Sequence, residues 1–152
     1  MTRKSPIHFD GTGDVRRHPI QFVTVCTKNK RKILDNEHAH KALVEAWEKA
    51  DAWLVGRYVV MPDHVHLFCA PAAHEPATLA KWIAYWKSQT SKSMPDSVSR
   101  PVWQKEYWDR ILRTGDSYEK KWQYVLHNPV RAGLVKHATD WPYLGELNEL
   151  RL

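Results

Sequence analysis

The residues with the clearest chemical potential are His64 and His66, which follow a Pro62-Asp63 turn signal and begin a run rich in β-branched and aromatic residues. Such a run predicts a strand over residues 64–70. Because side chains alternate along a strand, the two imidazoles share one face with Phe68, and the opposite face is apolar. Two adjacent imidazoles can chelate one divalent ion when a third ligand arrives from elsewhere, although paired histidines also occur on strand faces that meet only solvent.

A tyrosine and an asparagine on one predicted helix form the second candidate. The segment after Thr114-Gly115-Asp116 predicts a helix that runs through Asn128 and ends at Pro129, because proline disfavours the helical conformation in the residue before it. At about 100° per residue, one side of this helix is apolar and Tyr124 lies on a separate polar stripe with Lys121 and Asn128. Tyr124 and Asn128 are therefore one turn apart. Such pairs are common on helix surfaces, so the pair alone does not establish a site.

Periodicity and capping residues predict the elements that position these side chains. The expected strands lie at residues 21–27, 53–61, 64–70, 102–104 and 107–113. Asn36 is expected to cap a helix over residues 37–51, and Thr78 another that reaches residue 93, each with an apolar stripe at helical spacing. Most of the 8 tryptophans are expected to lie in the core.

Composition places the chain among globular proteins. Its 152 residues suit one domain over residues 1–152, and a hydrophobic fraction of 43% is sufficient for a core. The two cysteines, Cys26 and Cys69, fall in predicted strands, which favours buried free thiols over a disulfide. Because no apolar run approaches the roughly 20 residues of a membrane span, and the first residues lack the apolar segment of a signal peptide, we expect a cytoplasmic protein.

Positive charge is in excess and gathers in a few segments. Lys and Arg number 23 against 17 Asp and Glu, a formal charge of +6 with a pI near 9.4, which favours a polyanionic partner without requiring one. Residues 1–19 predict an irregular arm that holds Arg16 and Arg17, and a basic run over residues 28–32 follows the first long strand. Both segments suit contact with phosphates, and both also fit a solvated tail or loop.

Three blocks of sequence together resemble the REP-associated tyrosine transposases, a group within the single-tyrosine HUH transposases. The blocks are residues 61–66, 103–110 and 124–135, in family order, and His64-Val65-His66 matches the His-hydrophobe-His motif that names the class. The resemblance covers residues 22–143. It implies an α+β fold with a ferredoxin-like central antiparallel β-sheet flanked by α-helices, in agreement with the order of predicted elements.

The resemblance also implies roles for individual residues. His64 and His66 match the metal-binding pair, Asn128 the residue that completes the metal site, and Tyr124 the nucleophile. A tyrosine that attacks a phosphodiester forms a covalent phosphotyrosine, which retains the energy of the ester so that a strand hydroxyl can later reseal the DNA. The implied cofactor is a divalent metal, Mg²⁺ or Mn²⁺, that acts as a Lewis acid on the scissile phosphate.

The implied substrate is single-stranded DNA cut beside a hairpin formed by a repeated extragenic palindrome, and the implied activity is that of a transposase at the nucleoid. Basic side chains are expected to follow the DNA backbone, and an exposed tryptophan to stack on a splayed base. The expected backbone contacts are Arg16, Arg17, Lys28, Lys30, Arg31, Lys32, Arg110, Arg113 and Lys121. We expect a monomer, with a homodimer as the alternative.

Two other functions fit part of the same pattern. A hairpin-binding protein that has lost catalysis would keep the fold, but the presence of His64, His66, Tyr124 and Asn128 argues against that loss. A metal-dependent phosphodiesterase that activates water would leave Tyr124 with only a structural role. Formation of a covalent adduct between protein and DNA would distinguish the three functions.

Overall fold

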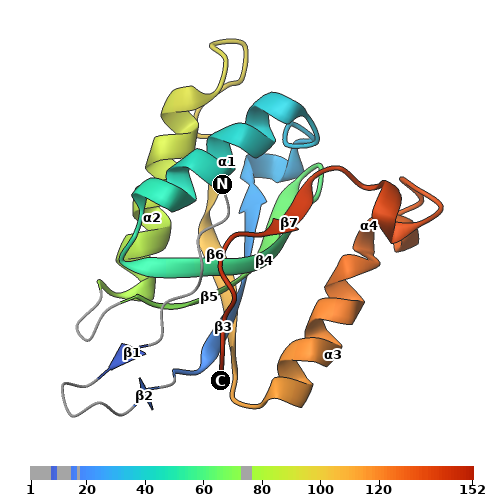
Figure 1. The fold of residues 1–152 in the computed structure, drawn as a ribbon. Helices are drawn as coiled ribbons and strands as arrows, with labels where there is room; N and C mark the ends of the chain where they lie inside the picture. The colour runs from blue at the N-terminus through green and yellow to red at the C-terminus, as the bar shows by residue number, and fades with distance from the viewer. Residues whose placement is uncertain (1–7, 10–14, 17, 73–76) are drawn as a thin grey trace.

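The computed structural model of the protein describes residues 8–9, 15–16, 18–72 and 77–152. A five-stranded sheet lies between helices on its two faces (Figure 1). Its strands are β3 (Ile20–Thr27), β4 (Trp53–Val60), β5 (His64–Pro71), β6 (Trp103–Leu112) and β7 (Leu144–Glu146). The helices are α1 (Glu37–Lys49), α2 (Leu79–Ser93), α3 (Gly115–Leu126) and α4 (Asn128–Arg131), with short 3-10 turns at Lys28–Lys30 and Ala138–Asp140.

The sheet is antiparallel, in the order β6-β3-β5-β4-β7. From β3 to β6 the chain runs strand, helix, strand, strand, helix, strand, with β3 and β5 in the centre, which is the ferredoxin-like arrangement. β7 extends the sheet beyond β4. The predicted fold class is therefore confirmed.

The N-terminal segment contains two short strands where an irregular arm was expected. His8–Phe9 (β1) and Val15–Arg16 (β2) pair antiparallel to each other. Arg17 and the side chain of Arg16, both expected to contact DNA, lie outside the described residues. None of the described helices is long and apolar enough to cross a bilayer.

Helices α1 and α2 cover one face of the sheet (Figure 1). Their predicted caps are confirmed: Asn36 Oδ1 accepts from the Ala39 amide at 2.8 Å, and Thr78 Oγ1 accepts from the Lys81 amide at 3.2 Å. Tryptophan rings pack edge to face beneath the two helices, and Trp86 is completely buried. The apolar face of β5 supplies the floor of this core, and both cysteines are free thiols.

Helix α3 lies on the other face of the sheet (Figure 1). The ring of Phe68 contacts Tyr118 and Trp122 of α3, with ring centroids 5.0 and 6.2 Å apart, and it is fully buried. Phe68 therefore shares the face of the histidines, as predicted, but that face is itself partly core. The sheet has apolar packing on both sides because α3 covers a face that alternation alone does not identify as buried.

One prediction of the strands is wrong, because β6 is a single strand where two were expected at residues 102–104 and 107–113. Its residues pair with β3 from Trp103 opposite Thr27 to Leu112 opposite Ile20, with a bulge at one point. The polar residues in its middle suggested a break. They are tolerated because β6 is an outer strand, where charged side chains can remain in solvent.

Candidate active site

Backbone hydrogen bonds fix the turn that presents the histidines at the start of β5. The Thr27 amide donates to the Asp63 carbonyl at 2.9 Å, which joins the turn to the end of β3. Further along, His66 pairs with Thr24 across the same two strands. Alternation along β5 then directs both imidazoles to the face on which α3 lies.

The two imidazoles face each other through their Nε2 atoms, which lie 3.1 Å apart. The Nδ1 atom of His64 lies 2.7 Å from Oδ1 of Asp63. Because a carboxylate only accepts, Nδ1 of His64 is the donor, and in the neutral ring Nε2 then offers a lone pair. The Nδ1 atom of His66 lies 2.8 Å from Oγ1 of Thr24, a hydroxyl that can donate or accept. Both rings can therefore present an Nε2 lone pair to the same point.

This geometry fits a divalent metal. Burial lowers the pKa of His66 to about 3, and the nearby charges of His64, Lys121 and Arg131 act in the same direction, so the ring is neutral at pH 7. Neutral imidazole is the form that binds metals. Two ligands on adjacent corners of an octahedron with bonds of about 2.1 Å lie about 3.0 Å apart. The observed Nε2–Nε2 distance of 3.1 Å agrees with that spacing.

A third ligand has to be of another chemical type. Among the described residues, no three His, Cys, Asp or Glu side chains are grouped to hold a metal. The amide of Asn128 offers an oxygen, which accepts from Nη2 of Arg131 at 3.3 Å and retains a second lone pair. The positive charge of Arg131 also lowers the pKa of His66, although burial has the largest effect.

Helix α3 turns Tyr124 away from the core. The helix begins with a capping box in which Thr114 and Ser117 satisfy each other's backbone amides. Trp122 and Val125 are buried against the sheet, as predicted from the apolar stripe. Tyr124 lies between these two positions in sequence and projects outward, with 61% of its surface exposed. A phenol so exposed is accessible to a DNA strand.

The predicted helix through Asn128 is wrong at its end, where the chain breaks and starts again. Helix α3 ends at Leu126, and Asn128 is the first residue of the short helix α4, with Pro129 in its first turn. Proline is well placed there, because the first amides of a helix have no partner within it. Gly133, at a φ of 76°, ends α4 in the left-handed conformation that glycine adopts without strain.

Because the chain continues as α4, Arg131 joins the site. Its guanidinium carbon lies 3.8 Å from the centroid of the Tyr124 ring. The ammonium of Lys121 lies 5.5 Å from the same centroid and 4.9 Å from that of Phe22, whose ring stacks on His66. Lys121 therefore lies between the tyrosine ring and the ring that stacks on His66, whereas Arg131 stacks on the tyrosine alone. Sequence reasoning missed Arg131 because it ended the helix at Pro129, although the spacing of three residues after Asn128 was a usable signal.

The expected DNA contacts fall in different places. Lys28, Lys30 and Lys32 are exposed just beyond the end of β3 that pairs with His64, close to the histidine turn. Arg31 instead donates to the backbone carbonyls of four residues, a role that holds loops together. Arg110 and Lys121 line one hollow. Arg113 follows the C-terminal end of β6, whereas the N-terminal end of β6 pairs with β3 near the histidine turn. The structure therefore gathers only part of the predicted set near the histidines.

Comparisons with known proteins identify the family of this chain. The family described as transposase IS200 like matches residues 15–127. A REP-associated tyrosine transposase of Escherichia coli K12 is 24% identical over 86% of this chain and 80% of its own length. A Haemophilus influenzae protein, whose name provisionally assigns it to the same group, is 27% identical over 55% of this chain. The chain spans only 53% of that second relative.

Two solved structures share the fold. A REP-associated tyrosine transposase bound to a REP hairpin has a TM-score of 0.71 at 24% identity, over 86% of this chain and 81% of its own. A transposase-like protein from Deinococcus radiodurans R1 has a TM-score of 0.54 at 18% identity, over 78% and 95% of the two chains. The resemblance inferred from three sequence blocks is confirmed, and this chain belongs to the IS200-like transposase family, a family of DNA-processing enzymes.

Proposed function

We propose that this protein cuts and rejoins single-stranded DNA next to a REP-type hairpin, through a covalent bond between the DNA and Tyr124. One observation carries the proposal: the exposed phenol lies under Arg131, and Lys121 lies over both that phenol ring and Phe22, whose ring stacks on His66. A nucleophile and a phosphate-binding group therefore share one location. The relative bound to a REP hairpin supports the choice of DNA.

The chemistry is a transesterification at phosphorus. The Oη atom of Tyr124 loses its proton and forms a bond to phosphorus, the bond to the leaving strand oxygen breaks, and that oxygen takes up a proton to become a strand hydroxyl. The new phosphotyrosine keeps the energy of the ester, so a strand hydroxyl can reverse the step and reseal the DNA. Arg131 and Lys121 place positive charge beside the ring, where they neutralise the phosphate as charge develops.

His64, His66 and Asn128 are the residues that would hold Mg²⁺ or Mn²⁺, which would act there as a Lewis acid on the scissile phosphate. Asp63 and Thr24 orient the two rings by holding their Nδ1 atoms. We also propose that a monomer suffices, because Lys121 lies over the tyrosine ring and over Phe22, which stacks on His66, within one chain.

The direct test is capture of the adduct. Labelled single-stranded DNA with a REP-type hairpin is incubated with the protein and Mn²⁺, and the products are separated under denaturing conditions. We expect a protein–DNA adduct that mass spectrometry assigns to Tyr124, and no adduct with Tyr124→Phe. That substitution removes one exposed hydroxyl, so the thermal midpoint should stay nearly unchanged.

Matched tyrosines provide the controls. Tyr118 lies on the buried side of α3, and Tyr107 lies on β6. Tyr118→Phe and Tyr107→Phe should both still form the adduct. DNA attached to either of these tyrosines would show that the nucleophile is misassigned. Cleavage without any adduct would instead favour a phosphodiesterase that activates water, and binding alone would favour a silent hairpin-binding protein.

A further inference from the structure

A shallow hollow of about 260 Å³ lies beside the candidate active site, on the part of the sheet next to α3. Phe22 and Thr24 of β3, Trp108, Asp109 and Arg110 of β6, and Lys121 of α3 line it. The volume is below the roughly 300–1,000 Å³ of a pocket that encloses a whole drug-sized ligand. It therefore suits one unit of a longer ligand that continues across the surface.

Strand register places this hollow in line with the histidines. Trp108 pairs with Thr24, and Thr24 pairs with His66 on its other side, so the three residues form one row across the sheet. Neighbouring strands are about 4.8 Å apart, so the indole starts about two strand spacings from His66. The hollow and the metal-binding pair are adjacent parts of one surface.

Trp108 differs from the other tryptophans of the protein. Its side chain is 54% exposed, whereas the remaining seven are at most 9% exposed. The buried ones are Trp47, Trp53, Trp82, Trp86, Trp103, Trp122 and Trp141. An indole left in water next to a catalytic surface, with positive charge on both sides, has the composition of a stacking platform for single-stranded nucleic acid.

We propose that this hollow is a subsite for one unpaired nucleobase that flanks the cleaved phosphodiester, stacked on Trp108, with Lys121 and Arg110 beside the adjoining phosphates. The inference rests on the proposed function, because the strand that occupies the subsite is the strand that Tyr124 attacks. Lys121 reaches both places, since its ammonium lies over the rings of Phe22 and Tyr124. Stacking accepts every base, so the subsite contributes affinity and position more than sequence preference.

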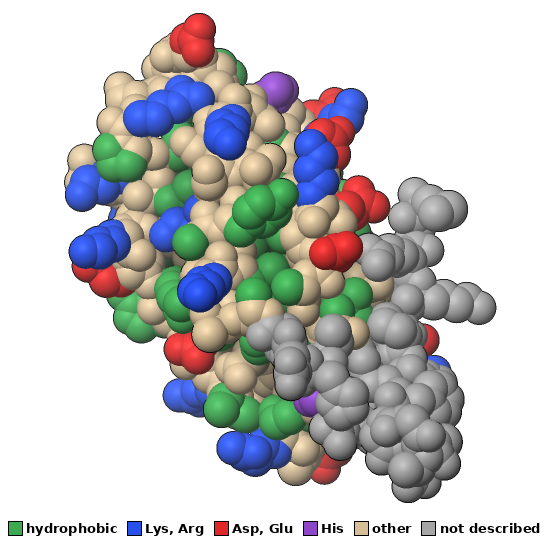
Figure 2. Space-filling model, turned by 90° about the vertical axis from the view of Figure 1, so that its left-hand side faces the viewer, with side chains coloured by type: hydrophobic (Ala, Val, Ile, Leu, Met, Phe, Trp, Pro, Cys, Tyr) green, Lys and Arg blue, Asp and Glu red, His purple; other side chains and the backbone are tan. Residues whose placement is uncertain are grey.

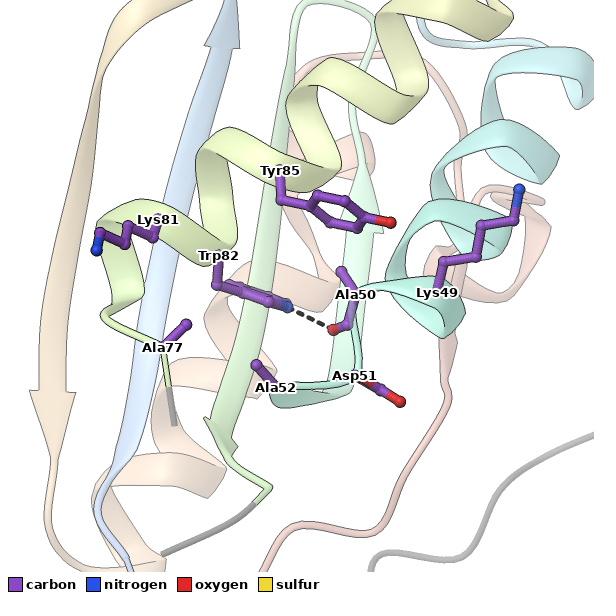
Figure 3. A pocket seen from close by; sticks show the side chains of 8 residues that line it. All are labelled: Lys49, Ala50, Asp51, Ala52, Ala77, Lys81, Trp82 and Tyr85. Carbon is purple, nitrogen blue, oxygen red and sulfur yellow. Dashed lines mark hydrogen bonds between the residues drawn. The ribbon is translucent and has the colours of Figure 1, made fainter. Parts of the chain in front are cut away.

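The face on the α2 side provides a built-in control. Figure 2 shows Lys and Arg side chains scattered over it among hydrophobic ones. It contains a hollow of about 390 Å³, lined by Trp82 and Tyr85 of α2 and by Lys49 and Lys81 (Figure 3). Tyr85 is 46% exposed, close to the value for Trp108. This hollow also offers an aromatic ring and lysines, but it lies on the opposite face of the sheet from the histidines.

The first experiment measures affinity for a labelled single-stranded oligothymidylate, with chelator present so that binding is separated from cleavage. Loss of stacking on one base is about 1–3 kcal/mol, so Trp108→Ala should bind about 5-fold to 150-fold more weakly. Trp108→Phe should recover part of the loss, and Tyr85→Ala should bind like the unmodified protein. Equal affinities for Trp108→Ala and the unmodified protein, or an equal loss in Tyr85→Ala, would overturn the subsite.

A second measurement needs no substitution. An oligonucleotide that carries 5-iodouracil is irradiated with the unmodified protein, and the crosslinked peptide is identified by mass spectrometry. Attachment to Trp108 supports the subsite, and attachment to Tyr85 instead overturns it. Adduct formation at Tyr124 together with unchanged oligothymidylate binding by Trp108→Ala would remove the subsite and leave the proposed function. Binding that depends on Trp108, with no adduct, would leave a stacking site for single-stranded DNA and remove the proposed cleavage by Tyr124.

Discussion

The two faces of the sheet are covered to different extents, and the candidate chemistry lies where coverage is incomplete. On one face, α1 and α2 lie side by side over a continuous core with large buried rings. On the other face, α3 packs on Phe68 of β5 but leaves Trp108 and Arg110 of β6 exposed. A helix that covers only part of a sheet creates a boundary between core and solvent, and His66 lies at that boundary.

Position at this boundary explains how His66 can be neutral and still accessible. One side of its ring stacks on Phe22, which is nearly buried, and its Nε2 atom points to His64. Burial of this kind lowers the pKa of an imidazole, whereas a ring fully in solvent would be partly protonated near pH 6.5. The face under α1 and α2 stabilises the fold, and the partial cover on the other face keeps the imidazole of His66 neutral.

The largest expected effect is on the partly covered face. His66→Ala should abolish Mn²⁺-dependent cleavage, because one of two imidazole ligands is lost, while the free energy of unfolding falls by only about 1–2 kcal/mol. Binding of hairpin DNA should remain, since affinity comes mainly from backbone contacts. Cleavage gels, gel-shift titrations and urea unfolding test these three points. Cleavage by His66→Ala at the rate of the unmodified protein would contradict the proposed metal site. His64→Ala provides an independent test of the same site.

The opposite pattern is expected beneath α1 and α2. Trp86→Ala should lower the free energy of unfolding by about 3–5 kcal/mol, because a fully buried ring leaves a cavity. Trp86→Phe should lower it much less. Among the described residues the indole nitrogen of Trp86 has no hydrogen-bond partner, so no bond is lost with it. Urea titration measures both values. Equal losses for the two variants would mean that this core is not tightly packed.

A smaller effect is expected on the salt dependence of DNA binding, where basic side chains on the two faces should differ. Arg131→Met should reduce the salt dependence of single-stranded DNA binding by about 0.7 in log-log slope, the value for one released counterion. Lys49→Met, on the hollow beneath Tyr85, should leave the slope unchanged. Affinities over a series of salt concentrations give the slopes. A larger change with Lys49→Met would place the DNA on the α2 side.

The smallest expected effect is a pH dependence on the covered face. Burial lowers the pKa of His40, whose Nε2 atom lies 2.7 Å from the Tyr58 hydroxyl. Below the unfolded-state pKa of about 6.5 the unfolded chain binds more protons than the folded one, so stability should fall as the pH decreases from 6.5 towards the folded-state pKa. His40→Gln should lose less stability between pH 7 and pH 5.5 in thermal unfolding. An equal loss would contradict this assignment.

Much of the fold was predictable because local signals agreed with it. Asn36 and Thr78 provide cap hydrogen bonds that require only a few neighbouring residues, and alternation located β3, β4 and β5 within a residue or two. The histidine pair and the outward position of Tyr124 follow from the same periodicities. The ferredoxin-like class of the sheet was implied by the family resemblance, and the structure adds the order of its strands.

The rest depends on contacts between distant residues. Nothing near Phe68 in the sequence indicates that α3 will cover it, and nothing near Lys105 indicates that β6 is an outer strand, where charge is tolerated. Proline was interpreted as a helix terminator, but Pro129 initiates α4. Because the predicted helix ended at Pro129, Arg131 was not among the predicted site residues.

The break between α3 and α4 also has a consequence for protein engineering. The two helices are held separately, α3 by Trp122 against Phe68 and α4 by its buried Pro129, so the break is a natural point at which to alter their relative rotation. One residue inserted into α3 just before Tyr124 would turn the phenol by about 100° relative to the start of the helix. Arg131 would keep its place on α4, and the stacking of its guanidinium on the tyrosine would be lost. Chain length at this point therefore determines where the Tyr124 phenol points as strictly as residue identity does.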